Sequence, residues 1–139
     1  MRWTDLLWFF AAVSMFLPCV RVLASNVEVL AVELLRLNGD TDHVELAAFV
    51  VRGKNGELEL VHWPPPARGV FRAAHWDGPL PSGVVGVIHT HPWTIPRPSR
   101  QDEWEARRLA MPVYVVSRTS LCVAASAGGV SCSRIKTWS

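Results

Sequence analysis

The chain has 139 residues, of which 50% are hydrophobic and 19% are charged, and its formal net charge is +2. A chain of this length is expected to form one compact domain with a real core, without help from metals or many disulfides. The near-neutral charge argues against a nucleic-acid partner, because such proteins usually carry a strongly basic face.

The first 24 residues are expected to lie outside this domain. They begin with the charged Arg2, continue with an apolar run over residues 6–20, and end with small residues before Ser25. This order is typical of a cleaved export signal. The run is short for a bilayer core, which needs about 20 apolar residues in a helix, so we favour export over an uncleaved membrane anchor. Membrane association through residues 6–20 stays open, and the domain then comprises residues 25–139.

The first half of the domain is predicted to be a helix followed by two paired strands. Residues 25–38 place apolar side chains at helical spacing, with Ser25 and Glu28 spaced as a capping box and a glycine after the last turn. Residues 44–63 contain two β-rich runs around a Lys-Asn-Gly turn, which predicts a hairpin. In the looser stretch that follows, one short strand is expected near residues 70–74.

The second half is predicted to contain a buried strand, a helix and three further strands. Residues 83–91 form the strand, because aliphatic residues and glycines precede its polar end. After a proline-rich loop, residues 99–110 are predicted to be helical. Three β-rich runs follow, at residues 112–118, 121–126 and 129–135.

Cys122 and Cys132 are the two cysteines of the expected domain. They flank a Gly-Gly turn signal, and a hairpin loop centred on Ala127 would place them directly opposite each other. In an oxidising compartment this pair is expected to form a disulfide. If the chain instead stays in the cytosol, we expect two small buried thiols.

The stretch VIHTHPWTIPRPSRQDEW, residues 87–104, combines four polar residues in a pattern suited to a metal ion. Alternate side chains of a strand point to one face about 6.6 Å apart, so His89 and His91 can converge on one zinc ion. Ser99 is placed to cap the next helix, and Asp102 in its first turn can face inward as a third ligand. Strand-end histidines and an ordinary helix cap explain each part alone, but the whole combination favours a metal site with a fourth position open to water.

The pattern of His-x-His, seven residues and Ser-x-x-Asp resembles the signature of the JAMM metalloproteases, the catalytic members of the MPN-domain family. The order of elements is similar across most of residues 26–137. The resemblance implies an α/β (α+β) fold of the MPN/JAB type, with a mixed β-sheet flanked by helices in a layered architecture similar to that of cytidine deaminases. It also implies a zinc-dependent peptidase or isopeptidase. His89, His91 and Asp102 would bind Zn²⁺, and Ser99 would help to stabilise the oxyanion.

The family uses an upstream glutamate as general acid/base, and the resemblance assigns this role to Glu45. This residue would take a proton from zinc-activated water and later return it to the leaving amine. The family often has glycines soon after this glutamate, whereas Leu46, Ala47 and Ala48 stand here. The other glutamates have a simple explanation as parts of solvated faces, on the first helix or beside the hairpin turn: Glu28, Glu33, Glu57 and Glu59.

The resemblance favours a hydrolase of peptide or isopeptide bonds, and the N-terminal segment favours its export to a periplasmic or extracellular location. Cell-wall peptides and small peptide conjugates are conceivable substrates. The alternative is a non-catalytic MPN-type scaffold or interaction module that keeps a metal. His43, His62 and His75 lack metal-ligand spacing and are expected to be surface or loop residues, with His43 or His75 at the border of the cleft as the alternative. Trp93 is a candidate either for a substrate groove or for a cap on the core.

Overall fold

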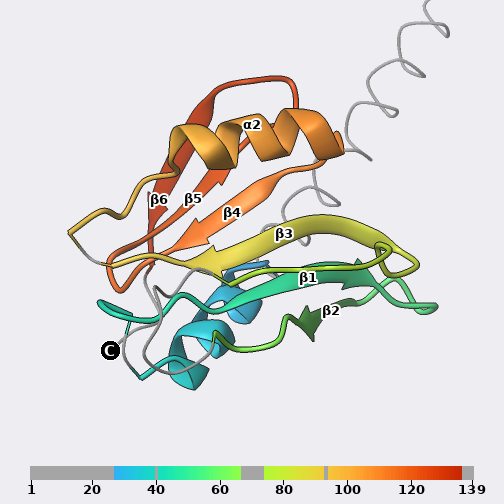
Figure 1. The fold of residues 1–139 in the computed structure, drawn as a ribbon, viewed down its shortest axis with the longest axis horizontal. Coiled ribbons are helices and arrows are strands. Elements are labelled where there is room, and N and C mark those ends of the chain that lie inside the picture. The colour runs from blue at the N-terminus through green and yellow to red at the C-terminus, as the bar shows by residue number, and fades with distance from the viewer. Residues whose placement is uncertain (1–26, 40, 67–73, 93, 136–139) are drawn as a thin grey trace, which may run out of the picture.

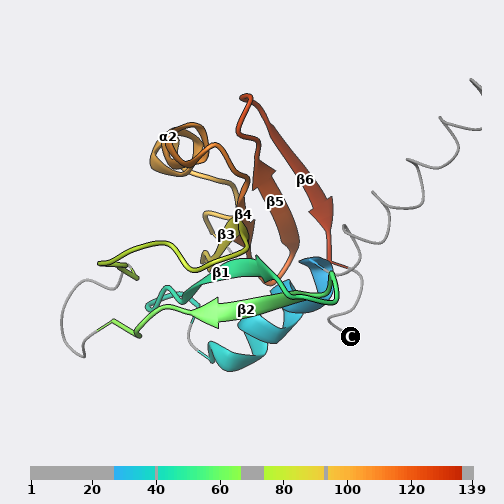
Figure 2. The same cartoon turned by 90° about the vertical axis from the view of Figure 1, so that its right-hand side faces the viewer.

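The computed structural model describes four stretches of the chain, residues 27–39, 41–66, 74–92 and 94–135. In this part a six-stranded mixed sheet carries a helix on each face (Figures 1 and 2), so the predicted α+β class with a flanked mixed sheet is confirmed. Neither helix of the described stretches has the length and apolar character that a membrane span requires. The expected export signal or anchor over residues 1–24 lies outside the described residues, as does nearly all of the strand predicted near residues 70–74.

The sheet has the strand order β2-β1-β3-β4-β5-β6. Its strands are β1 (Ala47–Arg52), β2 (Leu58–His62), β3 (Val84–Thr90), β4 (Val113–Val116), β5 (Ser120–Ala124) and β6 (Val130–Arg134). β3 and β4 are parallel, and the other neighbouring pairs are antiparallel. A parallel pair needs a long crossover, which the loop and helix between β3 and β4 provide. The predicted hairpin, buried strand and three closing strands are therefore confirmed.

A helix over residues 27–37, called the N-terminal helix below, packs on one face of the sheet. Apolar side chains recur along it every three or four residues, so one side of the helix can be buried. It shares a core cluster with the sheet that includes Leu30, Ala31, Leu34, Leu35, Ala48, Val50 and Ile88. The helix predicted over residues 25–38 is confirmed in the described part, whereas its predicted cap at Ser25 lies outside that part.

The second helix, α2 (Arg100–Leu109), packs on the opposite face and begins at a capping box. The Ser99 side chain accepts a hydrogen bond from the Asp102 N–H, and the Asp102 side chain accepts one from the Ser99 N–H. Two backbone donors that a helix start would otherwise leave unpaired are thereby satisfied. Ala106 of this helix is fully buried in a cluster with Phe49 and Val87 of the sheet. The helix predicted over residues 99–110 is confirmed.

β5 and β6 form a closing hairpin that carries a disulfide between Cys122 and Cys132. The two cysteines are partners in the strand register, as a loop centred on Ala127 requires. Gly128 and Gly129 have φ angles of 100° and 92° in the turn, which glycine adopts without the penalty that a side chain would add. The structure thus confirms the expected disulfide rather than two free thiols.

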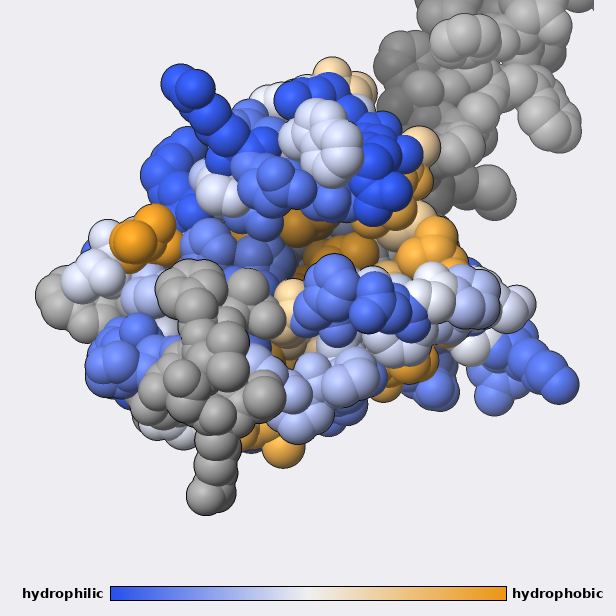
Figure 3. Space-filling model, viewed as in Figure 1, coloured by the Kyte–Doolittle hydropathy of each residue, from blue (hydrophilic) through white to orange (hydrophobic). Residues whose placement is uncertain are grey.

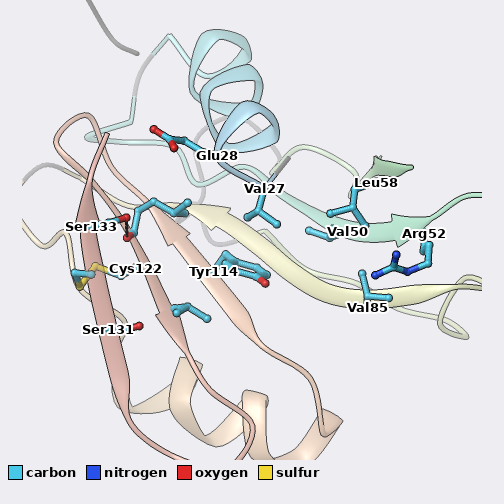
Figure 4. A pocket seen from close by; sticks show the side chains of 13 residues that line it. Val27, Glu28, Val50, Arg52, Leu58, Val85, Tyr114, Cys122, Ser131 and Ser133 are labelled. Carbon is cyan, nitrogen blue, oxygen red and sulfur yellow. Dashed lines mark hydrogen bonds between the residues drawn. A yellow bond between two sulfur atoms is a disulfide. The ribbon is translucent and has the colours of Figure 1, made fainter. Parts of the chain in front are cut away.

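A hollow of about 570 Å³ lies on the sheet face beside the N-terminal helix. We call it the N-terminal hollow. Most of its lining is apolar and includes Val27, Val85 and Tyr114. Figure 4 shows Tyr114 near the middle of this lining, with Glu28 and Arg52 well apart at its margins.

Candidate metal centre

The ends of β1 and β3 bring Glu45 beside the two histidines. Ala47, the first residue of β1, pairs with His89 near the end of β3. Because strand side chains alternate between faces, Ala47 and His89 point to the face on which α2 lies, and His91 follows His89 on that side. Glu45, His89 and His91 each offer a ligand atom, and these three atoms all lie within 4.8 Å of one another.

The first turn of α2 brings Asp102 to the same place. Asp102 Oδ1 lies 2.8 Å from His89 Nε2, and Asp102 Oδ2 lies 3.7 Å from His91 Nε2. The Ser99 N–H and hydroxyl both donate to Asp102 Oδ2, at 2.6 Å and 2.9 Å. The helix cap therefore also orients the carboxylate that faces the histidines. The structure thus brings together all five residues that the sequence singled out, although their chemical roles remain predictions.

The ring of His91 is oriented by two backbone carbonyls. Its Nδ1 lies 2.9 Å from Ile95 O and 3.1 Å from Arg97 O. Carbonyl oxygens only accept hydrogen bonds, so Nδ1 must carry the proton and donate it. Nε2 is then left with a free lone pair on the side of Asp102. A metal-binding histidine is commonly oriented in this way, because a backbone partner on the second nitrogen settles the tautomer.

His89 has two buried ring nitrogens that make no hydrogen bond within the described structure. Its Nε2 approaches Asp102 Oδ1 and its Nδ1 lies 3.5 Å from Glu45 Oε1, but these are ion-pair contacts without hydrogen-bond geometry. A buried polar atom without a well-directed hydrogen bond needs an explanation, and here the carboxylate contacts compensate for burial only while the ring is protonated. A divalent metal explains it, since imidazole nitrogens with carboxylate oxygens are a donor set that zinc accepts. The residues present therefore fit a metal.

The charges of the cluster shift its pKa values strongly. Burial lowers the pKa of His89, but contacts with Asp102 and Glu45 outweigh burial and raise this pKa to about 9. Burial likewise opposes ionisation of Asp102, yet contacts with His89 and Ser99 lower its pKa to about 2. For His91, burial and then the charge of His89 lower the pKa. Without metal, His89 is therefore protonated at neutral pH, and a metal must displace that proton to bind.

The cluster lies at one side of a cleft of about 630 Å³, which we call the α2-side cleft. Figure 3 shows a recess below α2 with apolar residues in its floor. Gln101, Glu105 and Arg108 of α2 contribute to its lining. Arg108 already pairs with Glu105, at 2.6 Å between Nη2 and Oε2, which agrees with an ordinary solvated helix face. Ser99 opens onto this cleft as well.

Aromatic residues that the sequence did not single out also line the α2-side cleft. The ring of Phe49 lies 5.2 Å from that of Trp63 and 4.9 Å from that of Trp76, measured between centroids. No local pattern marks these tryptophans, because the path of the chain after β2 and before β3 decides where they lie. His75 lines the cleft as a candidate for its border, whereas His43 is not among the lining residues. Trp93 lies outside the described residues.

Comparison with known proteins identifies the domain. A family model described as prokaryotic homologs of the JAB domain matches residues 27–134, which include all five residues of the cluster. No curated protein matches the chain. The family includes metalloisopeptidases and also non-catalytic members. Together with the mixed sheet and the candidate metal cluster, the match confirms the resemblance to the JAMM proteins: the chain belongs to the prokaryotic JAB-domain family, of the JAMM/MPN type.

Proposed function

We propose that this protein is a zinc-dependent hydrolase of peptide or isopeptide bonds. The observation that carries the proposal is the convergence of buried, unsatisfied ring nitrogens of His89 with the oriented ring of His91 and two carboxylates. Such a cluster beside a cleft is the usual arrangement of a catalytic metal site. Membership of a family that includes metalloisopeptidases supports the choice of reaction.

His89, His91 and Asp102 are the proposed ligands. Two carboxylates lie near the histidines: Glu45 has an oxygen within 4.8 Å of a nitrogen of each ring, and Asp102 is the third ligand that the family resemblance implies. It faces the Nε2 atoms of both rings, whereas Glu45 faces Nδ1 of His89. Zinc held there would lower the pKa of a bound water toward about 7 and polarise a carbonyl oxygen.

Glu45 is the proposed general acid/base. Its side chain is 29% exposed and lines the α2-side cleft, so a water or a substrate can reach it. Its carboxylate can accept a proton from the attacking water and return it to the leaving amine. The Ser99 hydroxyl is the proposed donor to the oxyanion. This hydroxyl now donates to Asp102 Oδ2 and must turn away to donate elsewhere, while the Asp102 N–H, 3.2 Å away, can keep its oxygen in place.

The test is to purify the full chain, measure its zinc content, and assay hydrolysis of a library of internally quenched peptides. We expect one zinc per chain and cleavage of some peptides. A His89→Ala/His91→Ala variant should lose both. A wild type that binds no zinc, or a double variant that binds as much as wild type, would rule the proposal out.

A non-catalytic, metal-keeping module is the second candidate, because the family also has non-catalytic members. Glu45→Gln separates the two, since an enzyme should lose turnover while keeping its metal. Glu28→Gln is the matched control, because Glu28 lines the N-terminal hollow on the other face. Equal activity of Glu45→Gln and wild type would favour the module.

Export is the proposed location, and peptides or isopeptide-linked conjugates outside the cytosol are the proposed substrates. The disulfide between Cys122 and Cys132 supports a non-reducing compartment. Sequencing the N-terminus of the mature protein tests this. A start near Ser25 is expected, whereas an intact Met1 in a membrane fraction would favour an anchor over residues 6–20.

A further inference from the structure

Glu45 is not held by the β-ladder. β1 begins at Ala47, and the last ladder pair on this side joins Ala47 to His89. Glu45 therefore lies in the connecting segment between the N-terminal helix and β1. Its carboxylate nevertheless lies 3.5 Å from the His89 ring, so something outside the ladder must determine where it lies.

Asn38 holds the peptide group before Glu45. It directly follows the N-terminal helix, its backbone N–H donates to Leu34 O at 3.1 Å, and its side chain is buried. The side-chain amide Nδ2 donates to Val44 O at 2.6 Å and to Thr90 Oγ1 at 2.9 Å. The end of the helix is thereby tied both to the segment that carries Glu45 and to the strand that carries the histidines.

Thr90 holds the peptide group after Glu45. Its Oγ1 accepts from the Leu46 N–H at 3.0 Å, and its own N–H donates to Leu46 O at 2.9 Å. Thr90 is only 1% exposed. Because strand side chains alternate, Thr90 points to the face opposite to that of His89 and His91. The hydrogen bonds of Asn38 and Thr90 thus lie behind the metal cluster and do not enter it.

We propose that Asn38 and Thr90 are positioning residues that fix the Glu45 carboxylate against the histidine pair. The inference rests on the proposed role of Glu45 as general acid/base. Hydrogen bonds to these two side chains hold the peptide groups on both sides of Glu45, and Thr90 is the residue between the two histidines. Buried networks of this kind rigidify a structure. A shift of about 1 Å in a catalytic group can slow catalysis by about 100-fold, so the network controls the rate without touching substrate.

Thr90→Val tests the inference, because valine keeps the shape of threonine and removes the hydroxyl. Ser117→Ala is the matched control: Ser117 is buried, and its hydroxyl also accepts two backbone N–H groups, those of Thr119 and Ser120. In the full chain we expect Thr90→Val to lower kcat about 10- to 100-fold with KM unchanged. Its stoichiometry of Co²⁺ binding should equal that of wild type. Thr90→Ser, which retains the hydroxyl, should restore most of the rate.

Amide hydrogen exchange gives a readout that needs no substrate. Asn38→Ala removes the bonds to Val44 O and Thr90 Oγ1 but does not touch Leu46 directly. If the hydrogen bonds act as one unit, exchange at the Leu46 amide, which donates to Thr90 Oγ1, should be faster in Asn38→Ala than in Ser117→Ala. If Thr90→Val does not fold, Asn38→Ala serves as the test variant in its place.

Exchange at the Leu46 amide that matches the Ser117→Ala control would overturn the positioning role. So would a Thr90→Val variant with the kcat of wild type, or a Thr90→Ser variant as slow as Thr90→Val. Failure of the proposed function gives a different result. Wild type would then cleave no peptide in the library, while faster exchange in Asn38→Ala would still support the fixing of Glu45 by Asn38 and Thr90.

Discussion

Two hollows of similar size lie on opposite faces of the same sheet, the α2-side cleft of about 630 Å³ and the N-terminal hollow of about 570 Å³. The hollow is lined mainly by apolar residues and the cleft by apolar and polar residues in equal number, and each includes aromatic and charged side chains. In the cleft, charged partners raise the pKa of His89 and lower that of Asp102 against the effect of burial. In the hollow, burial alone raises the pKa of Tyr114. Convergent titratable groups therefore distinguish the candidate metal site from the other hollow, whereas volume does not.

The charged residues of the two hollows differ in their arrangement as well. Figure 4 shows Glu28 and Arg52 far apart at the margins of the N-terminal hollow. In the cleft, Glu45 and Asp102 approach the same histidine from its two ring nitrogens. Because these buried carboxylates raise the pKa of His89, its protonation is expected to change with pH and with metal binding. The following predictions use the N-terminal hollow as the internal control for the cleft.

The largest effect is expected on turnover. Glu45→Gln removes the proposed general base and should lower kcat about 10²- to 10⁴-fold, the usual contribution of general acid–base catalysis. Bound zinc, measured by elemental analysis, should stay at the wild-type level. Glu28→Gln should leave both quantities unchanged. If the two variants had equal activity, the contrast between the hollows would fail.

The next effect is expected on metal affinity. His91→Ala removes a proposed ligand, and loss of a mere supporting partner already costs about 10- to 100-fold in affinity, so the loss here should exceed about 100-fold. Tyr114→Phe in the N-terminal hollow should bind zinc as wild type does. Competition with a chromophoric chelator measures both. A comparable loss of zinc affinity in Tyr114→Phe would show that substitutions on either face of the sheet weaken metal binding.

The disulfide is expected to affect stability and leave metal binding unchanged. Cys122 and Cys132 lie two and three strands away from His89 in the same cross-strand row, and they also contribute to the rim of the N-terminal hollow. Replacing both by serine should lower the free energy of unfolding by about 2–4 kcal/mol, mainly because the unfolded chain is no longer restrained. Urea unfolding of zinc-free protein gives this value, and chelator competition gives the affinity. A large change in zinc affinity would show that the closing hairpin influences the metal cluster across the sheet.

The smallest effect is expected from pH. Because the His89 pKa is about 9 without metal, zinc binding near pH 7 must release that proton, and affinity should rise about tenfold per pH unit between pH 7 and 9. In the metal-free protein, the raised pKa stabilises the fold fully below the unfolded value of 6.5, and this stabilisation is lost as pH rises through about 9. Calorimetry in buffers of different ionisation enthalpy counts the protons. No proton release near pH 7 would contradict the raised pKa.

Local patterns were enough to predict much of the candidate site. The alternation of a strand places His89 and His91 on one side, and a capping box four residues long ties Asp102 to Ser99. These relations depend on neighbours in the chain, so they hold whatever the order of the strands. The hairpin with Cys122 opposite Cys132 was predictable for the same reason, since a tight turn sets the register of its two strands.

Spacing alone did not separate Glu45 from the other glutamates, and family resemblance made that choice. The register of β1 with β3 gives the physical reason for it: Ala47 pairs with His89, so the segment just before β1 lies beside the histidines. Glu59 pairs with Val51 near the other end of β1, which carries it away from the cluster. A shift in this register would place a different segment beside the proposed metal ligands.

The hydrogen bonds of Asn38 and Thr90 and the aromatic lining of the cleft follow from tertiary structure alone. Asn38 and Thr90 are 52 residues apart and meet because the N-terminal helix ends behind the C-terminal end of β3. Trp63 directly follows β2, and its backbone N–H donates to Ala47 O at 2.9 Å. This hydrogen bond holds Trp63 beside β1, where its side chain lines the cleft. Short sequence patterns encode turns, caps and the alternation of strands. The order and register of strands arise from burial summed over the whole core, and they decide which distant residues meet at this site.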